Sequence, residues 1–201
     1  MPRKTVTPKK QEESTTQNGI PSIYASEQLP GVNVMHGDEQ LHTISVLVEN
    51  QPGVLARVAH VFARRGFNIE SLAVSRTEDA GVSRMTIVVA GDAAAFEQMG
   101  KQIYKLIDVI KVIDHTRDDL VGRELALIKL RTNDSTDRAE IMQIANVFRA
   151  NLVDISADTV MIEVTGKSDK LDAIQRMLEK FEILELVRTG VIVLMRGPKQ
   201  T

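Results

Sequence analysis

The chain has 201 residues, a formal net charge of −2, 43% hydrophobic and 26% charged residues, and no cysteine. This composition is typical of a globular protein with one large or two small domains, and it excludes disulfides, thiol chemistry and zinc–thiolate sites. Basic residues are scattered and no apolar run reaches about 18 residues, so we expect no nucleic-acid partner and no membrane span. No signal-peptide pattern follows the N-terminus, so a cytoplasmic location is expected.

Residues 1–40 differ in composition from the rest of the chain. They are rich in Lys, Thr, Ser, Gln, Pro and Gly and show no apolar periodicity. Such a segment cannot bury enough apolar surface to order itself. We therefore predict a flexible tail that could dock onto another surface but carries no chemistry.

Residues 41–117 have the pattern of a small α+β domain. Alternating and helical apolar spacings predict, in order, a strand over 41–49, a helix ended by Gly66, strands over 67–76 and 82–91, a helix capped by Asp92, and a strand over 109–116. This β-α-β-β-α-β order is the ferredoxin-like arrangement, in which both helices cover one face of a four-stranded antiparallel sheet.

Residues 123–201 repeat the same order of elements after a linker at 118–122. The predicted elements are a strand over 124–132, a helix over 136–150, strands over 151–156 and 159–166, a helix capped by Ser168, and a strand over 183–196 with a bend or bulge at Gly190. The two halves share little sequence. The fold class is therefore α+β, with two ferredoxin-like domains after the N-terminal tail.

Catalytic and metal sites are not visible in the sequence. None of the four histidines has a partner at metal-ligand spacing, and we expect them at the surface or at sheet edges. The chain contains no phosphate-binding glycine loop and no serine in a nucleophile elbow. We predict no catalytic residues, no metal ligands and no cofactor for this chain.

One turn has the chemistry of a binding site. The segment ENQPGVL (49–55) leads from a strand directly into a helix N-terminus, where free amides and the helix dipole favour a carboxylate. Gly53 leaves its backbone accessible to a ligand, while Asn50 and Asn68 offer amides that both donate and accept hydrogen bonds. These groups suit a zwitterionic amino acid. Alternatively, Asn50 is only a helix N-cap and Asn68 only a strand-entry residue.

Longer segments carry a resemblance to a known family. ENQPGVLARV at the first strand–helix turn resembles the ACT domain, a small-molecule sensing module. RRGFNIESLAVSRTEDAGVSRMTIVV (64–89) resembles the small subunit of acetolactate synthase. So do four segments of the second half: GRELALIKL (122–130), FRANLVDIS (148–156), TGKSDKLDA (165–173) and RTGVIVLMRG (188–197). The resemblance spans residues 41–197.

The resemblance implies a regulatory subunit without catalytic activity. Small subunits of this family pair through their ACT domains, and valine or another branched-chain amino acid binds at the seam. The matching effector residues are Asn50, Gly53 and Val54 from one chain with Asn68 and Ile69 from the other. Ala56 stands where many relatives have Ser, and Ser75 stands where some have Ala, which leaves the effector preference open.

The resemblance also implies a separate partner that performs the reaction. This large catalytic subunit carries thiamine diphosphate, Mg²⁺ and FAD. The small subunit's C-terminal domain, with help from the ACT domain, contacts and activates it. Two alternatives stay open. One is a free-standing ACT-domain sensor that acts on another enzyme or regulator, and the other is a self-sufficient enzyme.

Overall fold

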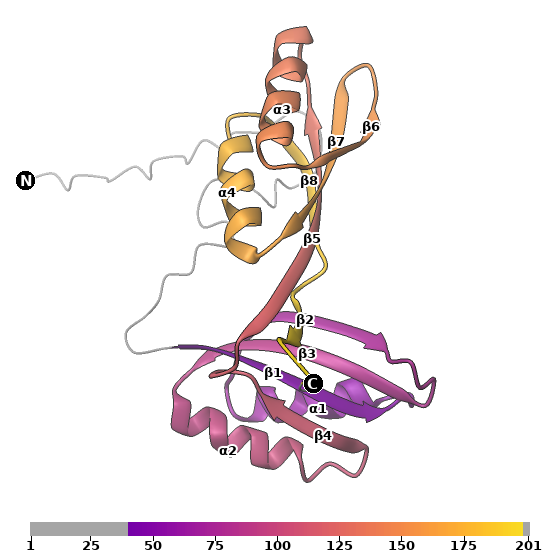
Figure 1. Ribbon diagram of the computed structural model, residues 1–201, viewed down its shortest axis with the longest axis vertical. Coiled ribbons are helices and arrows are strands. Elements are labelled where there is room, and N and C mark those ends of the chain that lie inside the picture. Colours follow the sequence, from indigo (N-terminus) through magenta and orange to yellow (C-terminus); the bar gives the residue numbers. More distant parts are fainter. Residues whose placement is uncertain (1–39, 199–201) are drawn as a thin grey trace, which may run out of the picture. The chain divides into compact units, whose positions relative to one another are not determined.

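The computed structural model describes residues 40–198, which form two antiparallel sheets with two helices each (Figure 1). The elements of the first domain are β1 (Gln40–Glu49), α1 (Val54–Arg64), β2 (Ile69–Arg76), β3 (Val82–Gly91), α2 (Ala93–Ile103) and β4 (Val109–Asp114). Those of the second are β5 (Leu120–Arg131), α3 (Ser135–Val147), β6 (Asn151–Ile155), β7 (Thr159–Gly166), α4 (Ser168–Leu178), β8 (Ile183–Arg188) and β9 (Ile192–Met195). The predicted α+β class with two β-α-β-β-α-β units is confirmed. The predicted tail at 1–40 lies almost wholly outside the described residues.

The first sheet has the strand order β2-β3-β1-β4, so β2 and β4 are its edges. Alternate residues of β1 are buried against the helices, as in Ile44, Val46 and Val48. Helix α1 contributes Val54, Val58 and Phe62 to the same core, each at most 2% exposed. Their spacing of four residues puts them on one helix face, which is the pattern that predicted this helix.

The second sheet repeats this plan and then extends it. Its order is β6-β7-β5-β8, and its core combines alternate residues of β5 with apolar residues of α3 and α4. The expected sheet has four strands, but the observed one has five, because β9 pairs with Leu120–Arg123 at the start of β5. Part of the predicted linker is therefore strand, and the single strand predicted over 183–196 is divided at Gly190, whose φ is 79°. The expected bend at Gly190 is confirmed.

Helix termini follow the expected capping chemistry at two of the four helices. The Asp92 side chain accepts from the Ala95 amide at 3.0 Å, and Asp134 caps α3 by accepting from the amides of Thr136 and Asp137. The predicted cap at Ser168 is wrong, because the N-cap of α4 is Lys167, with no side-chain hydrogen bond to the helix. Ser168 instead donates to Glu124 at 3.1 Å.

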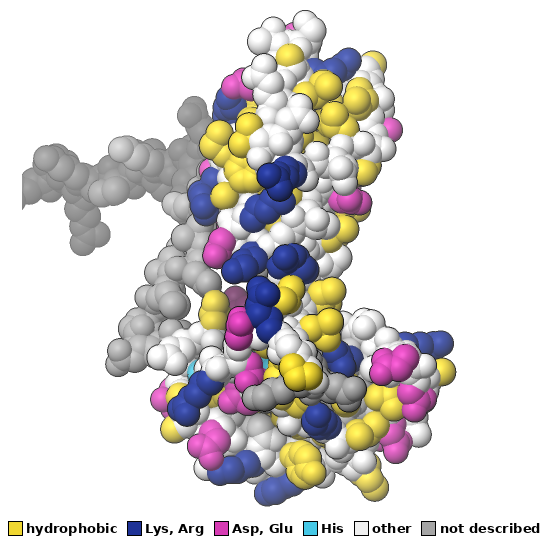
Figure 2. Space-filling view, in the orientation of Figure 1, with side chains coloured by type: hydrophobic (Ala, Val, Ile, Leu, Met, Phe, Trp, Pro, Cys, Tyr) yellow, Lys and Arg dark blue, Asp and Glu magenta, His cyan; other side chains and the backbone are white. Residues whose placement is uncertain are grey.

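The surface has no single charge character on the face drawn in Figure 2, where acidic, basic and hydrophobic side chains are interspersed. Between residues 40 and 198, no helix is both long and apolar enough to cross a membrane.

Candidate effector-binding site

The turn between β1 and α1 is held in place by backbone hydrogen bonds to two other segments. The Glu49 amide donates to the Asp108 carbonyl at 2.9 Å, and the Asn50 amide donates to the Gly81 carbonyl at 2.7 Å. The N-cap of α1 is Gly53, so no side chain caps the first turn of this helix. The helix N-terminus therefore stays open toward an anionic group.

Asn50 ties the turn to the β2–β3 hairpin. Its Nδ2 donates to the Ala80 carbonyl at 3.0 Å, and its Oδ1 accepts from the Ser83 hydroxyl at 3.1 Å. The alternative reading of Asn50 as a helix N-cap is therefore wrong, since Gly53 occupies that position. A side-chain amide has two donor hydrogens and two acceptor lone pairs, so one of each stays available for a ligand.

Gly53 is exposed and adopts a left-handed conformation with φ 81°. A Cβ at this position would lie 3.3 Å from an Nη atom of Arg57. The Arg57 Nε in turn donates to Asp108 Oδ2 at 2.7 Å, and Asp108 is only 6% exposed. An Arg57–Asp108 ion pair thus lies beside the open helix N-terminus, and Asp108 accepts from only one of the five N–H donors of the guanidinium group.

The remaining predicted effector residues have different surroundings. The Val54 side chain is 2% exposed and belongs to the core, so only its backbone lies at the turn. Asn68 is exposed and donates to Glu70 Oε1 at 2.8 Å, and Ile69 is partly buried against the first core.

The structure places the two halves of the predicted site at opposite ends of one sheet. On β3, Val82 pairs with Glu49 beside the turn, whereas Val89 pairs with Ile69. These β3 positions are seven residues apart, about 24 Å at roughly 3.4 Å per residue. Within one chain, therefore, Asn50 and Gly53 do not meet Asn68 and Ile69.

Two histidines contradict the expectation of surface or edge positions. His42 is 1% exposed and stacks on Phe96 with a centroid distance of 4.2 Å. His115 is 2% exposed and lies between Ser45 and Asp118, with Nε2 2.9 Å from Ser45 Oγ and Nδ1 3.1 Å from Asp118 Oδ2. Burial costs a polar ring little when both of its nitrogens are paired.

The Ser45–His115–Asp118 chain has the hydrogen-bond order of a serine hydrolase triad. Ser45 is fully buried, however, and no substrate carbonyl can reach a hydroxyl without solvent access. The three residues instead fasten the segment after β4 to the centre of the sheet. Across residues 40–198, no cluster of three His, Asp or Glu side chains could hold a metal ion.

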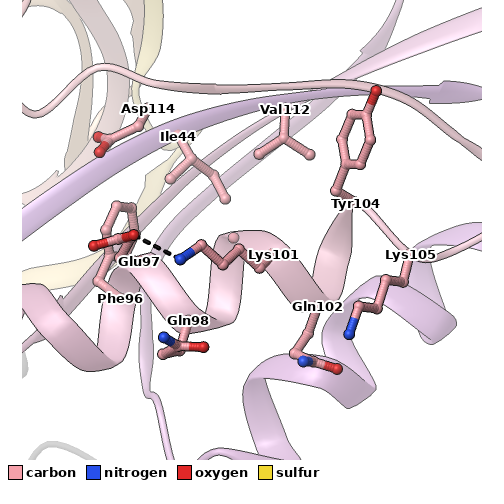
Figure 3. Close-up of a pocket in the computed structure, with 11 residues that line it drawn as sticks. Ile44, Phe96, Glu97, Gln98, Lys101, Gln102, Tyr104, Lys105, Val112 and Asp114 are labelled. Atoms are coloured by element: carbon pink, nitrogen blue, oxygen red, sulfur yellow. Dashed lines mark ion pairs between the residues drawn. The ribbon is translucent and has the colours of Figure 1, made fainter.

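The hollow between α2 and β4 is separate from the predicted effector residues. It has a volume of about 590 Å³, and its lining includes the apolar side chains of Ile44, Phe96 and Val112 (Figure 3). Lys101 and Glu97 form an ion pair of 2.7 Å at its rim. None of the predicted effector residues lines this hollow.

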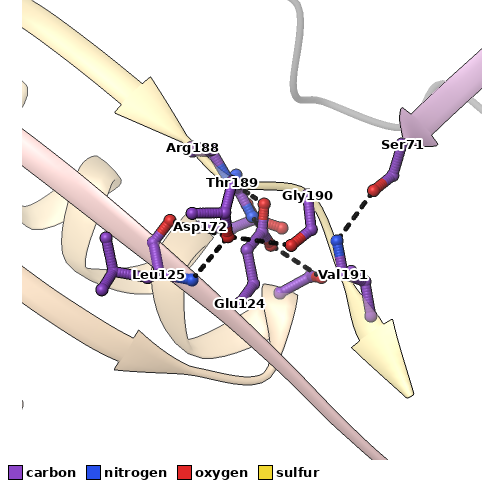
Figure 4. A network of polar contacts seen from close by, with 9 residues as sticks. Ser71, Glu124, Leu125, Asp172, Arg188, Thr189, Gly190 and Val191 are labelled. Atoms are coloured by element: carbon purple, nitrogen blue, oxygen red, sulfur yellow. Dashed lines mark hydrogen bonds and ion pairs between the residues drawn. The ribbon is translucent and has the colours of Figure 1, made fainter. Parts of the chain in front are cut away.

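A partly buried polar network organises the second domain (Figure 4). Arg188 donates to both carboxylate oxygens of Glu124, at 2.9 and 2.7 Å, and to Asp172 of α4 at 2.5 Å. Glu124 is 7% exposed. The hydrogen bond to Glu124 is the largest of the effects that raise the pKa of Arg188, and Asp172 adds to it, so the guanidinium stays charged. In the sequence, Glu124 looks like any other residue of the predicted strand over 124–132, so no local signal predicted this network.

Comparison with known proteins assigns the two domains separately. The family described as the small subunit of acetolactate synthase matches residues 123–197, and the small-subunit-like ACT domain of the same enzyme matches residues 44–111. The acetolactate synthase small subunit of Mycolicibacterium smegmatis is 52% identical over 158 residues, which are 79% of this chain and 92% of the relative. The chain belongs to the acetolactate synthase small-subunit family.

Other members of the family agree in length and in fold. A probable acetolactate synthase small subunit of Archaeoglobus fulgidus is 52% identical over 79% of this chain and 99% of its own length. The crystal structure of the small subunit from Thermotoga maritima superposes with a TM-score of 0.73 and 41% identity, covering 80% of this chain and 99% of that one. The expected family membership is thereby confirmed.

Proposed function

We propose that this chain is the regulatory subunit of an acetolactate synthase, which activates a separate catalytic subunit and makes it sensitive to a branched-chain amino acid. The observation that carries the proposal is the 52% identity to a named small subunit over 79% of the chain. The match of residues 123–197 to the family's own C-terminal domain favours this function over a free-standing sensor. The thiamine diphosphate, Mg²⁺ and FAD of the reaction belong to the catalytic partner.

The effector site in this proposal is shared between two copies of the chain. Each copy carries the Asn50–Gly53 turn at one end of its sheet and Asn68 at the other. Strand β2 is a sheet edge, and exposed edges are commonly covered by pairing with another strand. Two copies can pair their β2 edges antiparallel about a two-fold axis. The start of β2 in one copy then lies near the end of β2 in the other copy, which is the end of the sheet that carries the Asn50–Gly53 turn.

The chemistry of the turn supports an amino acid with an apolar side chain. Its carboxylate would face the uncapped N-terminus of α1 near Arg57, and its ammonium group would face amide oxygens of Asn50 and the partner's Asn68. Both amide oxygens are neutral acceptors, and the Glu70 carboxylate, which accepts from Asn68 at 2.8 Å, lies beside one of them. Valine, leucine and isoleucine differ by a methylene or its placement, which a pocket separates by only about 1–3 kcal/mol.

The decisive experiment mixes the full chain with the catalytic subunit from the same organism. Acetolactate formation is measured with the catalytic subunit alone, with the mixture, and with added valine, leucine or isoleucine. We expect activation by the chain and inhibition by at least one of the three amino acids. Equal activity with and without the chain would exclude the regulatory function.

A further inference from the structure

The connector between β8 and β9 lies against strand β2 of the first domain. The Val191 amide donates to Ser71 Oγ at 2.9 Å (Figure 4). A Cβ on Gly190 would lie 2.9 Å from both the Leu72 carbonyl oxygen and Ser71 Oγ. Gly190 also has φ 79°, so both the close approach and the backbone conformation require glycine.

The first-domain end of this contact is close in sequence to the proposed effector site. Asn68 and Ile69 precede Ser71 at the start of the same strand. The register between β2 and β3 shifts between Ile69 and Ser71, which marks a β-bulge. A bulge interrupts the ladder of hydrogen bonds, so the start of β2 is less firmly held to β3 than a regular strand is.

The second-domain end of the contact is joined to the partly buried network of Arg188. Arg188 comes directly before the connector and holds Glu124 of β5 and Asp172 of α4. Thr189, within the connector, accepts through Oγ1 from the Leu125 amide at 3.1 Å. A displacement of the connector therefore acts on β5 and α4 together, because close-packed hydrogen-bonded groups transmit small shifts.

We propose that the connector of residues 189–191 couples the effector site to the second domain. Effector binding at the seam shifts the start of β2. Ser71 and Leu72 transmit this shift to Gly190 and Val191 of the connector. Arg188 then transmits it to β5 and α4. Ser71 and Gly190 are positioning residues that contact no effector. The inference rests on the proposed function and assigns the route of its regulation.

The test separates effector binding from effector response. Ser71→Ala and Gly190→Ala are made in the full chain. Gly197→Ala is the control for backbone strain, since Gly197 has φ 77° and nothing within 4 Å of an added Cβ. Calorimetry measures valine binding to each free chain, and acetolactate formation measures activation and inhibition of each mixture.

We expect Ser71→Ala and Gly190→Ala to bind valine within about twofold of the parent and still to activate the catalytic subunit. Their half-inhibitory valine concentration should rise at least fivefold, the lower end of ordinary allosteric couplings. The Gly197→Ala control should behave as the parent. Unchanged inhibition in both variants, or loss of valine binding along with inhibition, would overturn the coupling role while leaving the regulatory function intact.

A second measurement needs neither valine nor the catalytic subunit. Arg188→Met removes the anchor of the connector in the second domain. If the connector couples the domains, amide hydrogen exchange should accelerate in β2 of the first domain, around Ser71–Arg76, as well as in β5. If amide exchange accelerates only within residues 120–196, the coupling proposal is refuted. This outcome does not depend on whether the chain has the proposed regulatory function.

Discussion

Gly53 offers the sharpest test of where the effector carboxylate binds. Gly53→Asp places a second carboxylate at the open N-terminus of α1. Two unit charges about 4 Å apart repel by about 4 kcal/mol near a protein surface. The Arg57 guanidinium, 3.3 Å from the position of the new Cβ, will neutralise part of this charge. We therefore expect a loss of about 2–3 kcal/mol in effector binding, or roughly 30- to 140-fold in the half-inhibitory valine concentration.

The stability cost of Gly53→Asp is separable from its effect on binding. A non-glycine residue in the left-handed region costs about 1–2 kcal/mol. Gly197→Asp is the matched control, because it adds the same charge at φ 77° with no neighbour within 4 Å. Acetolactate formation is titrated with valine for the parent and both variants. If Gly53→Asp remains as valine-sensitive as Gly197→Asp, the carboxylate does not bind at this turn.

Three further changes test other parts of the structure. Asn50→Ala removes two hydrogen bonds to the β2–β3 hairpin. It should lower the free energy of unfolding by about 1–3 kcal/mol in urea titrations and reduce valine sensitivity. An unchanged urea midpoint would show that these bonds contribute nothing to stability. Arg188→Met leaves Glu124 buried without its cation; chemical denaturation should show a loss of about 3–5 kcal/mol, and a loss under 1 kcal/mol would contradict a buried pair. A chain ending at residue 122 should still bind valine but activate the catalytic subunit poorly, whereas full activation would place the activating surface in the first domain.

Most of the secondary structure could be predicted because each element carries its own periodicity. The buried residues Val54, Val58 and Phe62 recur every four positions, and the buried apolar residues Ile44, Val46 and Val48 occupy every second position of β1. These patterns arise from local geometry, which places side chains on one helix face or one sheet face. The turn at 50–53 could also be predicted locally, because proline and glycine before a helical pattern predict an open helix start.

The sequence by itself determined the fold class, the order of the elements and the turn that forms half of the candidate site. Only the tertiary structure decided that Asn50 bonds to a hairpin 30 residues away, that His115 bridges Ser45 and Asp118, and that β9 pairs with the start of β5. It also decided that the two halves of the site lie at opposite ends of one sheet. These features join residues far apart in the chain, and such contacts leave no periodic trace because they depend on strand order and register rather than on local spacing.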